Sequence, residues 1–183
     1  MIRIEEQGTA RAAGFDDPIG LLEACHARIA AHCMTLGKLA RHLQDSGDPA
    51  MAREAATRVL HYFDTAGPLH HADEEADLRP LLQTRLEACG DEATLRRLDA
   101  LMNEHAALAD AYGPLRAALA RIVAGAAVSG LPIEPYVGLM RRHFTEENDL
   151  LFVRARALLS PADLRVLGAA MARRRGVQAG AVS

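Results

Sequence analysis

The sequence predicts an all-α protein, an antiparallel up-down-up-down four-helix bundle followed by a short C-terminal fifth helix. Three observations support this prediction. Apolar residues recur at spacings of three and four over long stretches, as they do on one face of an α-helix. Helix-start signals, in which Asp or Ser precedes Pro, divide the chain into segments as long as bundle helices. Aromatic residues make up only 4% of the chain and Trp is absent, which favours helix over sheet.

The first two helices are defined by matching start signals. Asp17-Pro18 begins the first, which is expected to run to about residue 45 and to end at Ser46-Gly47. Asp48-Pro49 begins the second, which is expected to run to about residue 88. Gly67-Pro68 lies in its middle and predicts a kink or a local bulge there, because proline lacks the N–H that a helix interior requires.

The remaining helices are bounded by similar start and stop signals. Cys89-Gly90-Asp91 closes the second helix and caps the third, in which Gly113-Pro114 predicts another bend. A link rich in Gly and Ala, ending at Leu131-Pro132, leads to the fourth helix. The segment Ser160-Pro161-Ala162-Asp163 has the form of a capping box and starts the short fifth helix.

Length and charge narrow the class of protein. A chain of 183 residues can bury a core without disulfides, and its three cysteines form no C-x-x-C pair. We expect one bundle domain over residues 16–174, between a flexible N-terminal arm (1–15) and a flexible C-terminal tail (175–183). A net charge of −3 argues against nucleic acid or a membrane surface as a partner. The basic run Arg173–Arg175 suits the dipole at a helix end.

The sequence also bears on location. No apolar stretch approaches the length of a membrane span, and the N-terminal residues lack the apolar segment of a signal peptide. We therefore expect a cytoplasmic protein.

The apolar stripes contain polar residues that a plain core should not hold. Each long helix places one histidine on its inward stripe, and two helices add a glutamate four residues later. Four residues are about one turn at 3.6 residues per turn, so each His and Glu pair shares a face. The six residues are His26, His70, Glu74, His105, His143 and Glu147.

A buried cation explains this pattern better than core packing does. A single core histidine is more often hydrogen-bonded than metal-bound. A carboxylate inside a bundle is costly unless a cation or donors compensate it, and no Lys or Arg lies at the level of Glu74 and Glu147 on the facing stripes. The sequence therefore predicts a metal site.

The ligand types indicate which metal and how many ions. Zinc favours thiolates in structural sites, and calcium and magnesium favour oxygen throughout. Four imidazoles with two carboxylates suit iron, manganese or another mid-row ion. Six ligands are too many for one ion that keeps an open position, whereas two ions about 3.5–4 Å apart and bridged by carboxylates use all six.

Other polar residues near the stripes are weaker candidates. His32 lies six residues from His26 and is therefore rotated about 120° away from the stripe. His71 and Glu75 repeat the four-residue spacing one position over, and form either an outer layer around the ligands or a solvated face. Four more are expected at the surface or, for the two glutamates, beside the ligands: Glu104, Glu146, His42 and His61. Three aromatic residues are expected in the core, where they could wall a small gas pocket: Phe63, Tyr112 and Tyr136.

The segments that contain these residues resemble the hemerythrin-like cation-binding (HHE) domain family. The resemblance covers residues 17 to about 158. Its four motifs, in chain order, are Asp17–Ile29, Tyr62-Phe63 with His70–Pro80, Glu104–Leu108, and His143–Glu147 with Leu150–Phe152. The resemblance implies that the six residues bind two non-haem iron ions, for which manganese or zinc could substitute.

Two positions depart from the family's oxygen carriers. Those proteins have a second His one turn after the third-helix ligand, where this chain has Ala109, and an Asp five residues after the last His, where it has Asn148. A pure O2 carrier is therefore disfavoured, and the missing ligand leaves an open position. The expected role is binding or sensing O2, NO or peroxide. The alternatives are a di-iron enzyme (a peroxidase, an NO-handling protein or an iron-delivering repair protein) and a purely structural bundle with a buried polar network.

Overall fold

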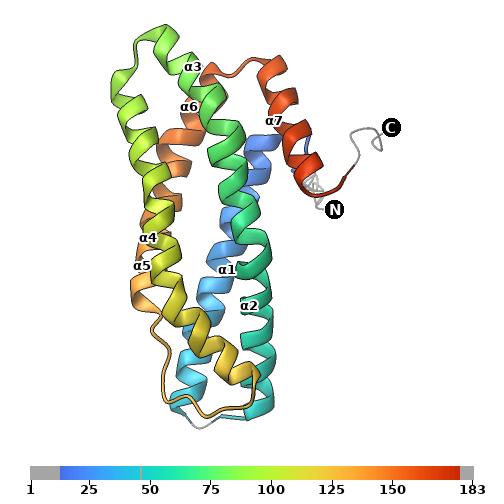
Figure 1. Cartoon of the computed structure of the whole chain (residues 1–183), viewed down its shortest axis with the longest axis vertical. Coiled ribbons are helices and arrows are strands. Elements are labelled where there is room, and N and C mark those ends of the chain that lie inside the picture. Colours follow the sequence, from blue (N-terminus) through green and yellow to red (C-terminus); the bar gives the residue numbers. More distant parts are fainter. Residues whose placement is uncertain (1–12, 46, 178–183) are drawn as a thin grey trace, which may run out of the picture.

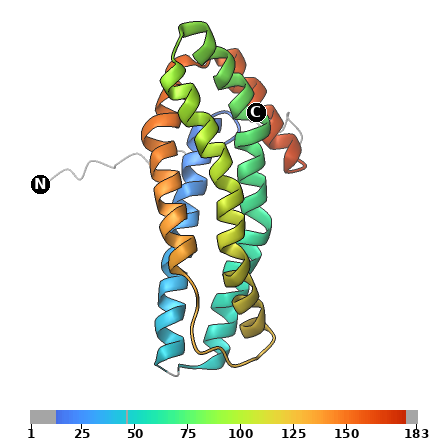
Figure 2. The same ribbon diagram turned by 60° about the vertical axis from the view of Figure 1, so that its left-hand side comes forward.

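The computed structural model describes residues 13–45 and 47–177, and these residues contain helices and no strand. Within the described residues four long helices, over residues 18–44, 49–89, 92–123 and 134–158, lie side by side along the long axis. A shorter helix, over residues 161–174, stands outside them (Figures 1 and 2). The elements in chain order are α1 (Pro18–Gln44), α2 (Pro49–Ala72), η1 (Asp73–Leu78), α3 (Arg79–Cys89), α4 (Glu92–Val123), α5 (Glu134–Glu146), η2 (Glu147–Leu151), α6 (Phe152–Leu158) and α7 (Pro161–Arg174). The predicted all-helical bundle is confirmed.

Some of the predicted termini lie outside the described residues. These are residues 1–12 of the expected arm, Ser46 and residues 178–183 of the expected tail. Phe15 is described and packs against the core, and Arg175 is hydrogen-bonded to Asp73. Within the described residues, no helix is both long and apolar enough to cross a bilayer.

The predicted helix starts are capped as the sequence indicates. The side chain of Asp17 accepts a hydrogen bond from the amide of Gly20 (3.0 Å), and that of Asp48 accepts one from Ala50 (2.8 Å). Before α7, Ser160 and Asp163 form a reciprocal capping box. These side chains satisfy amides that a helix N-terminus leaves unpaired.

The irregularity predicted at Gly67-Pro68 lies further along the chain. Helix α2 continues through Pro68, and the backbone widens into the π-helix η1 only at Asp73. Likewise α4 continues through Pro114. The two π-helical segments, η1 and η2, each begin within a residue of a buried glutamate, so the backbone departs from the α-helix at the polar layer and not at the prolines.

The apolar core consists of two clusters with the polar layer between them. One cluster, at the α7 end, includes Leu22 of α1 and Leu101 of α4. The other, at the far end, includes Ile29 of α1 and Leu108 of α4. On both helices the histidine lies between the two leucine or isoleucine residues, in the same position along the bundle. The bundle therefore holds a layer of charge and imidazole sealed at both ends by packed hydrocarbon.

Helix α7 is fixed against the rest of the domain by close packing. Leu167 and Met171 are fully buried in the α7-end cluster. Gly168 lies so close to the chain before α1 that a Cβ at this position would be 1.9 Å from the carbonyl oxygen of Phe15. Only glycine allows this approach.

Gly168→Ala should therefore destabilise the fold, by about 1–3 kcal/mol, because the methyl group would force backbone apart. Gly37→Ala is the matched control. Gly37 lies within α1, where an added Cβ meets nothing within 4 Å, so alanine should stabilise by about 0.5–1 kcal/mol through helix propensity. Urea unfolding measures both changes, and an undiminished unfolding free energy in Gly168→Ala would contradict the close approach.

Candidate metal centre

The six predicted site residues meet in the polar layer between the two apolar clusters. All are buried. The Nε2 atoms of His26 and His70 are 2.9 Å apart, and those of His105 and His143 are 3.0 Å apart. Each pair of imidazoles thus aims its Nε2 atoms at a common point, as two ligands of one ion do.

The two glutamates lie between these histidine pairs. Both are fully buried, and none of their four carboxylate oxygens has a hydrogen-bond partner within residues 13–45 and 47–177. Among the described residues their ion-pair partners are all histidines: Glu74 lies 3.3 Å from His70 and 3.5 Å from His105, and Glu147 lies 3.2 Å from His143 and 3.3 Å from His26. Such orphaned acceptors are rare in native interiors, and they fit a positively charged guest.

The ligand atoms form two groups that could each hold a metal ion. One group is His26, His70, Glu74 and Glu147, and the other is Glu74, His105, His143 and Glu147; within each, the ligand atoms lie within 4.8 Å of one another. The glutamates belong to both groups. By its chemistry the donor set fits metal ions, and the two shared glutamates are compatible with a site for two of them.

Outer hydrogen bonds fix three of the four imidazoles. The Nδ1 atom of His26 bonds to the side-chain oxygen of Asn148 (2.9 Å), that of His105 to Glu75 (2.6 Å) and that of His143 to Glu104 (3.0 Å). These oxygens only accept, so each Nδ1 donates and leaves the Nε2 lone pair free for a metal. His70 is the exception, because its buried Nδ1 has no partner.

The sequence misses one of these outer contacts. It leaves Glu75 and Glu104 either beside the ligands or at the surface, and the structure places them against His105 and His143. It assigns no such contact to Asn148. The position of Asn148 directly after Glu147 is the available signal, since consecutive residues of a π-helical turn can both reach the interior.

The remaining polar candidates belong to neither of the two groups. His32 stacks on Tyr62, with ring centroids 4.1 Å apart, as its rotation from the stripe predicted. His71 stacks on His105 at 4.0 Å and belongs to neither group. Glu146 pairs with Arg97. Two more are remote, with His42 bonded to the carbonyl of Asp48 and His61 exposed.

The π-helical segments explain how a four-residue repeat stays on one face. In an α-helix, four residues advance about 400°, so side chains spaced by four drift about 40° at each step. His70, Glu74 and Leu78 are nevertheless all buried, and η1 spans the second step. A π-helix, with its i→i+5 hydrogen bonds, winds more slowly and removes this drift. The same holds for Glu147 and Leu151, which are both buried and lie at the two ends of η2.

Burial sets the charge of the site in the absence of metal. Burial, with the charge of Glu147, raises the pKa of Glu74 to about 8. Burial opposes the charged form of His26 as well, but Glu147 and Glu74 outweigh it and raise its pKa to about 9. Burial also acts on Glu147, where the neighbouring His143 and His26 prevail and hold the pKa below its usual range. Without a bound metal, Glu74 and His26 therefore hold protons at neutral pH, and both must lose them before they can bind a cation.

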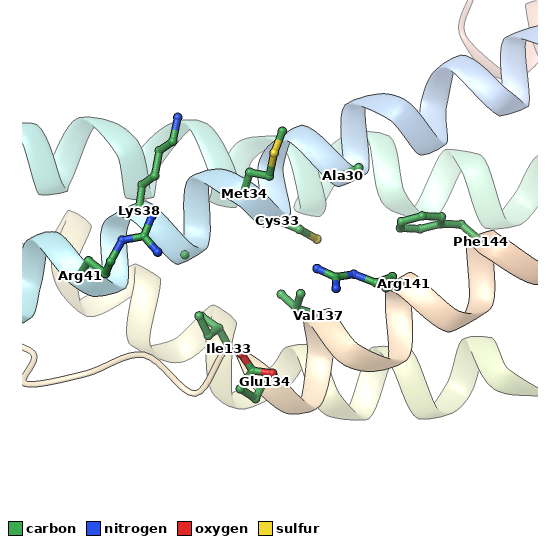
Figure 3. A pocket seen from close by; sticks show the side chains of 11 residues that line it. Ala30, Cys33, Met34, Lys38, Arg41, Ile133, Glu134, Val137, Arg141 and Phe144 are labelled. Carbon is green, nitrogen blue, oxygen red and sulfur yellow. The ribbon is translucent and has the colours of Figure 1, made fainter.

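Two cavities approach the layer from different sides. The larger, about 520 Å³, is a groove between α1 and α5 with Lys38, Arg41 and Arg141 on its walls (Figure 3). Phe144 lines one end of this groove and contacts the ring of His26, with centroids 5.6 Å apart, so it separates the groove from the ligands.

The smaller cavity, about 270 Å³, lies next to the polar layer, because His71 in its wall stacks on the ring of His105. Its wall is mostly apolar and includes Phe63, Tyr112 and Tyr136, the three residues that the sequence suggests as the wall of a gas pocket. His71 and Ala109 complete it on the side of His105.

Comparison with known protein families gives a match over residues 17–155 to the hemerythrin HHE cation binding domain. The chain belongs to this family. An uncharacterized protein of Haemophilus influenzae is 29% identical over 168 residues, which cover 91% of this chain and 94% of that relative. The hemerythrin match ends before α7, so this helix lies outside the matched residues.

Metal binding to this hemerythrin site should strengthen as the pH rises from 6 to 8. The protons on Glu74 (pKa about 8) and His26 (pKa about 9) must leave before a cation binds, so they compete below those pKa values and cease to compete above them. Affinity should rise about tenfold or more per pH unit, with proton release at pH 7. Chelator competition with Co²⁺ in weak buffer measures both, and a pH-independent affinity would contradict this protonation scheme.

Proposed function

We propose that this hemerythrin-like protein binds two non-haem iron ions and uses them to bind or sense O2, NO or peroxide. One ion would be held by His26 and His70 and the other by His105 and His143, with both glutamates shared. Manganese or zinc could occupy the same ligands. The family match supports cation binding. The two groups of possible ligand residues in this chain support the proposal of two ions.

The observation that supports it most strongly is the pair of shared glutamates. With a single ion, part of the six-residue set would have no partner. Without any ion, the four carboxylate oxygens would stay buried and unpaired. Two divalent cations would neutralise both carboxylates and draw all four Nε2 atoms toward them. The outer acceptors Asn148, Glu75 and Glu104 then hold the imidazoles in the tautomer that ligation needs.

The size and polarity of the small cavity favour an uncharged or small ligand. Iron supplies the redox chemistry and the affinity for diatomic ligands, and the chain supplies ligands and a dry pocket. The cavity lies beside His105 and has Ala109 in its wall, at the position where oxygen-carrying hemerythrins have another histidine. The short side chain of Ala109 would leave room for a ligand from outside next to an ion held by His105 and His143.

Substitution of the shared or terminal ligands should remove metal. We expect Glu74→Ala and His143→Ala each to lose most bound iron, because each removes one of the six proposed ligands and no other side chain is proposed to replace it. His42→Ala and His61→Ala are the controls, since both residues lie away from the two groups. Iron content after anaerobic reconstitution measures the effect, and equal retention in all four variants would reject this site.

Reconstituted protein should contain two iron ions per chain and change its optical spectrum with azide or NO. The spectral change is expected because a ligand set of this size leaves an open position on the iron. Less than one iron per chain would reject the dinuclear site. Sustained consumption of peroxide or NO would favour the enzyme over the sensor.

A further inference from the structure

Asp73 and Glu74 are adjacent residues, and both are completely buried. They point in different directions. Glu74 faces the histidines inside the bundle, whereas Asp73 faces α7 and accepts hydrogen bonds from Arg174 and Arg175. The basic run at the end of α7, which the sequence explains by the helix dipole alone, therefore has a specific partner beside a predicted metal ligand.

The two arginines play different parts. Arg175 binds Asp73 with two nitrogens, at 3.1 Å and 2.6 Å from its two oxygens, and so neutralises the buried carboxylate. Arg174 uses one nitrogen to reach both Asp73 and Asp77, each at 2.5 Å. Asp73 is the first residue of η1 and Asp77 is next to its last, so the Arg174 guanidinium bridges the two ends of the π-helical segment.

Glu74 lies between the two bridged aspartates. A π-helical turn is less regular than the α-helix and is easily lost unless its surroundings hold it. If η1 rewound into α-helix, the side chains would rotate by about 100° for each residue of register. Glu74 would then turn away from the histidines that it faces.

The second π-helical segment provides an internal comparison. Segment η2 carries Glu147, the other shared glutamate, and within the part of the chain that the structure describes no arginine pairs with it. Helix α7 contacts η1 and stands outside the four long helices (Figure 1). Within the described residues, the arginine bridge from α7 is therefore made to the segment that carries Glu74 and not to η2.

We propose that Arg174, by bridging Asp73 and Asp77, is a positioning residue through which α7 holds Glu74 in place for metal binding. Its effect on metal rests on the proposed function. Its effect on η1 does not, because the bridge joins side chains that belong to neither group of possible metal ligands.

The test uses Arg174→Gln and Asp77→Asn in the full chain. Each breaks the bridge from one side while Arg175 still neutralises Asp73, so no buried charge is stranded and the fold should survive. Arg173→Gln is the matched control, because Arg173 is exposed and has no hydrogen-bond or ion-pair partner within the described part of the chain. In metal-free protein we expect amide hydrogen exchange to quicken at least tenfold in η1 and to stay unchanged in η2.

Metal affinity is the second measurement. Chelator competition with Co²⁺ should show at least tenfold weaker binding in Arg174→Gln and in Asp77→Asn, and wild-type binding in Arg173→Gln. The double variant should bind no more weakly than either single one, since both break the same bridge. Additive losses would overturn the shared mechanism.

The two measurements separate the possible failures. Unchanged exchange in η1 would reject the bridge outright. Faster exchange with unchanged Co²⁺ affinity would reject the positioning of Glu74. If the wild-type protein binds no Co²⁺, the proposed function fails and the positioning role fails with it, while the exchange result still decides whether α7 holds η1.

Discussion

The structure depends on one constraint: two carboxylates occupy the middle of the bundle, and the part of the chain that the structure describes offers no hydrogen-bond donor to their oxygens. Removing a charge from water is costly, and packed hydrocarbon lies on both sides of this layer. Four imidazoles lower the cost only in part, because Glu74 keeps a raised pKa beside them. The proposed pair of cations would neutralise both carboxylates and so complete the interior of the fold.

The backbone conformation also helps to place the two carboxylates in this layer. Both glutamates lie at π-helical segments, where the slower winding keeps side chains four residues apart on one inward face. Outer acceptors then orient three of the imidazoles, and an arginine bridge from α7 spans one of the segments. The π-helical backbone, the hydrogen bonds that orient the imidazoles and the arginine bridge thus all act on the one polar layer. The two apolar clusters supply the stability that such a polar interior cannot.

Much of this could be predicted from the sequence because it is periodic. The inward stripes, the Asp-Pro starts and the His-to-Glu spacing put His70 and Glu74 on one inward face, and the structure brings all six residues into one layer. The repeat of four is also the signal for η1 and η2, whereas the prolines point to the wrong place for the irregularity. The partners of Asp73 could not be predicted, because Arg174 follows it by about a hundred residues and only the packing of α7 joins them.

The central claim is that Glu74 and Glu147 are shared between two cations. The most direct measurement is anomalous diffraction at the iron edge from crystals grown with ferrous iron. The account predicts two peaks about 3.5–4 Å apart, each beside one histidine pair, with both carboxylates between them. A single peak, an empty layer, or carboxylates turned toward solvent would contradict it.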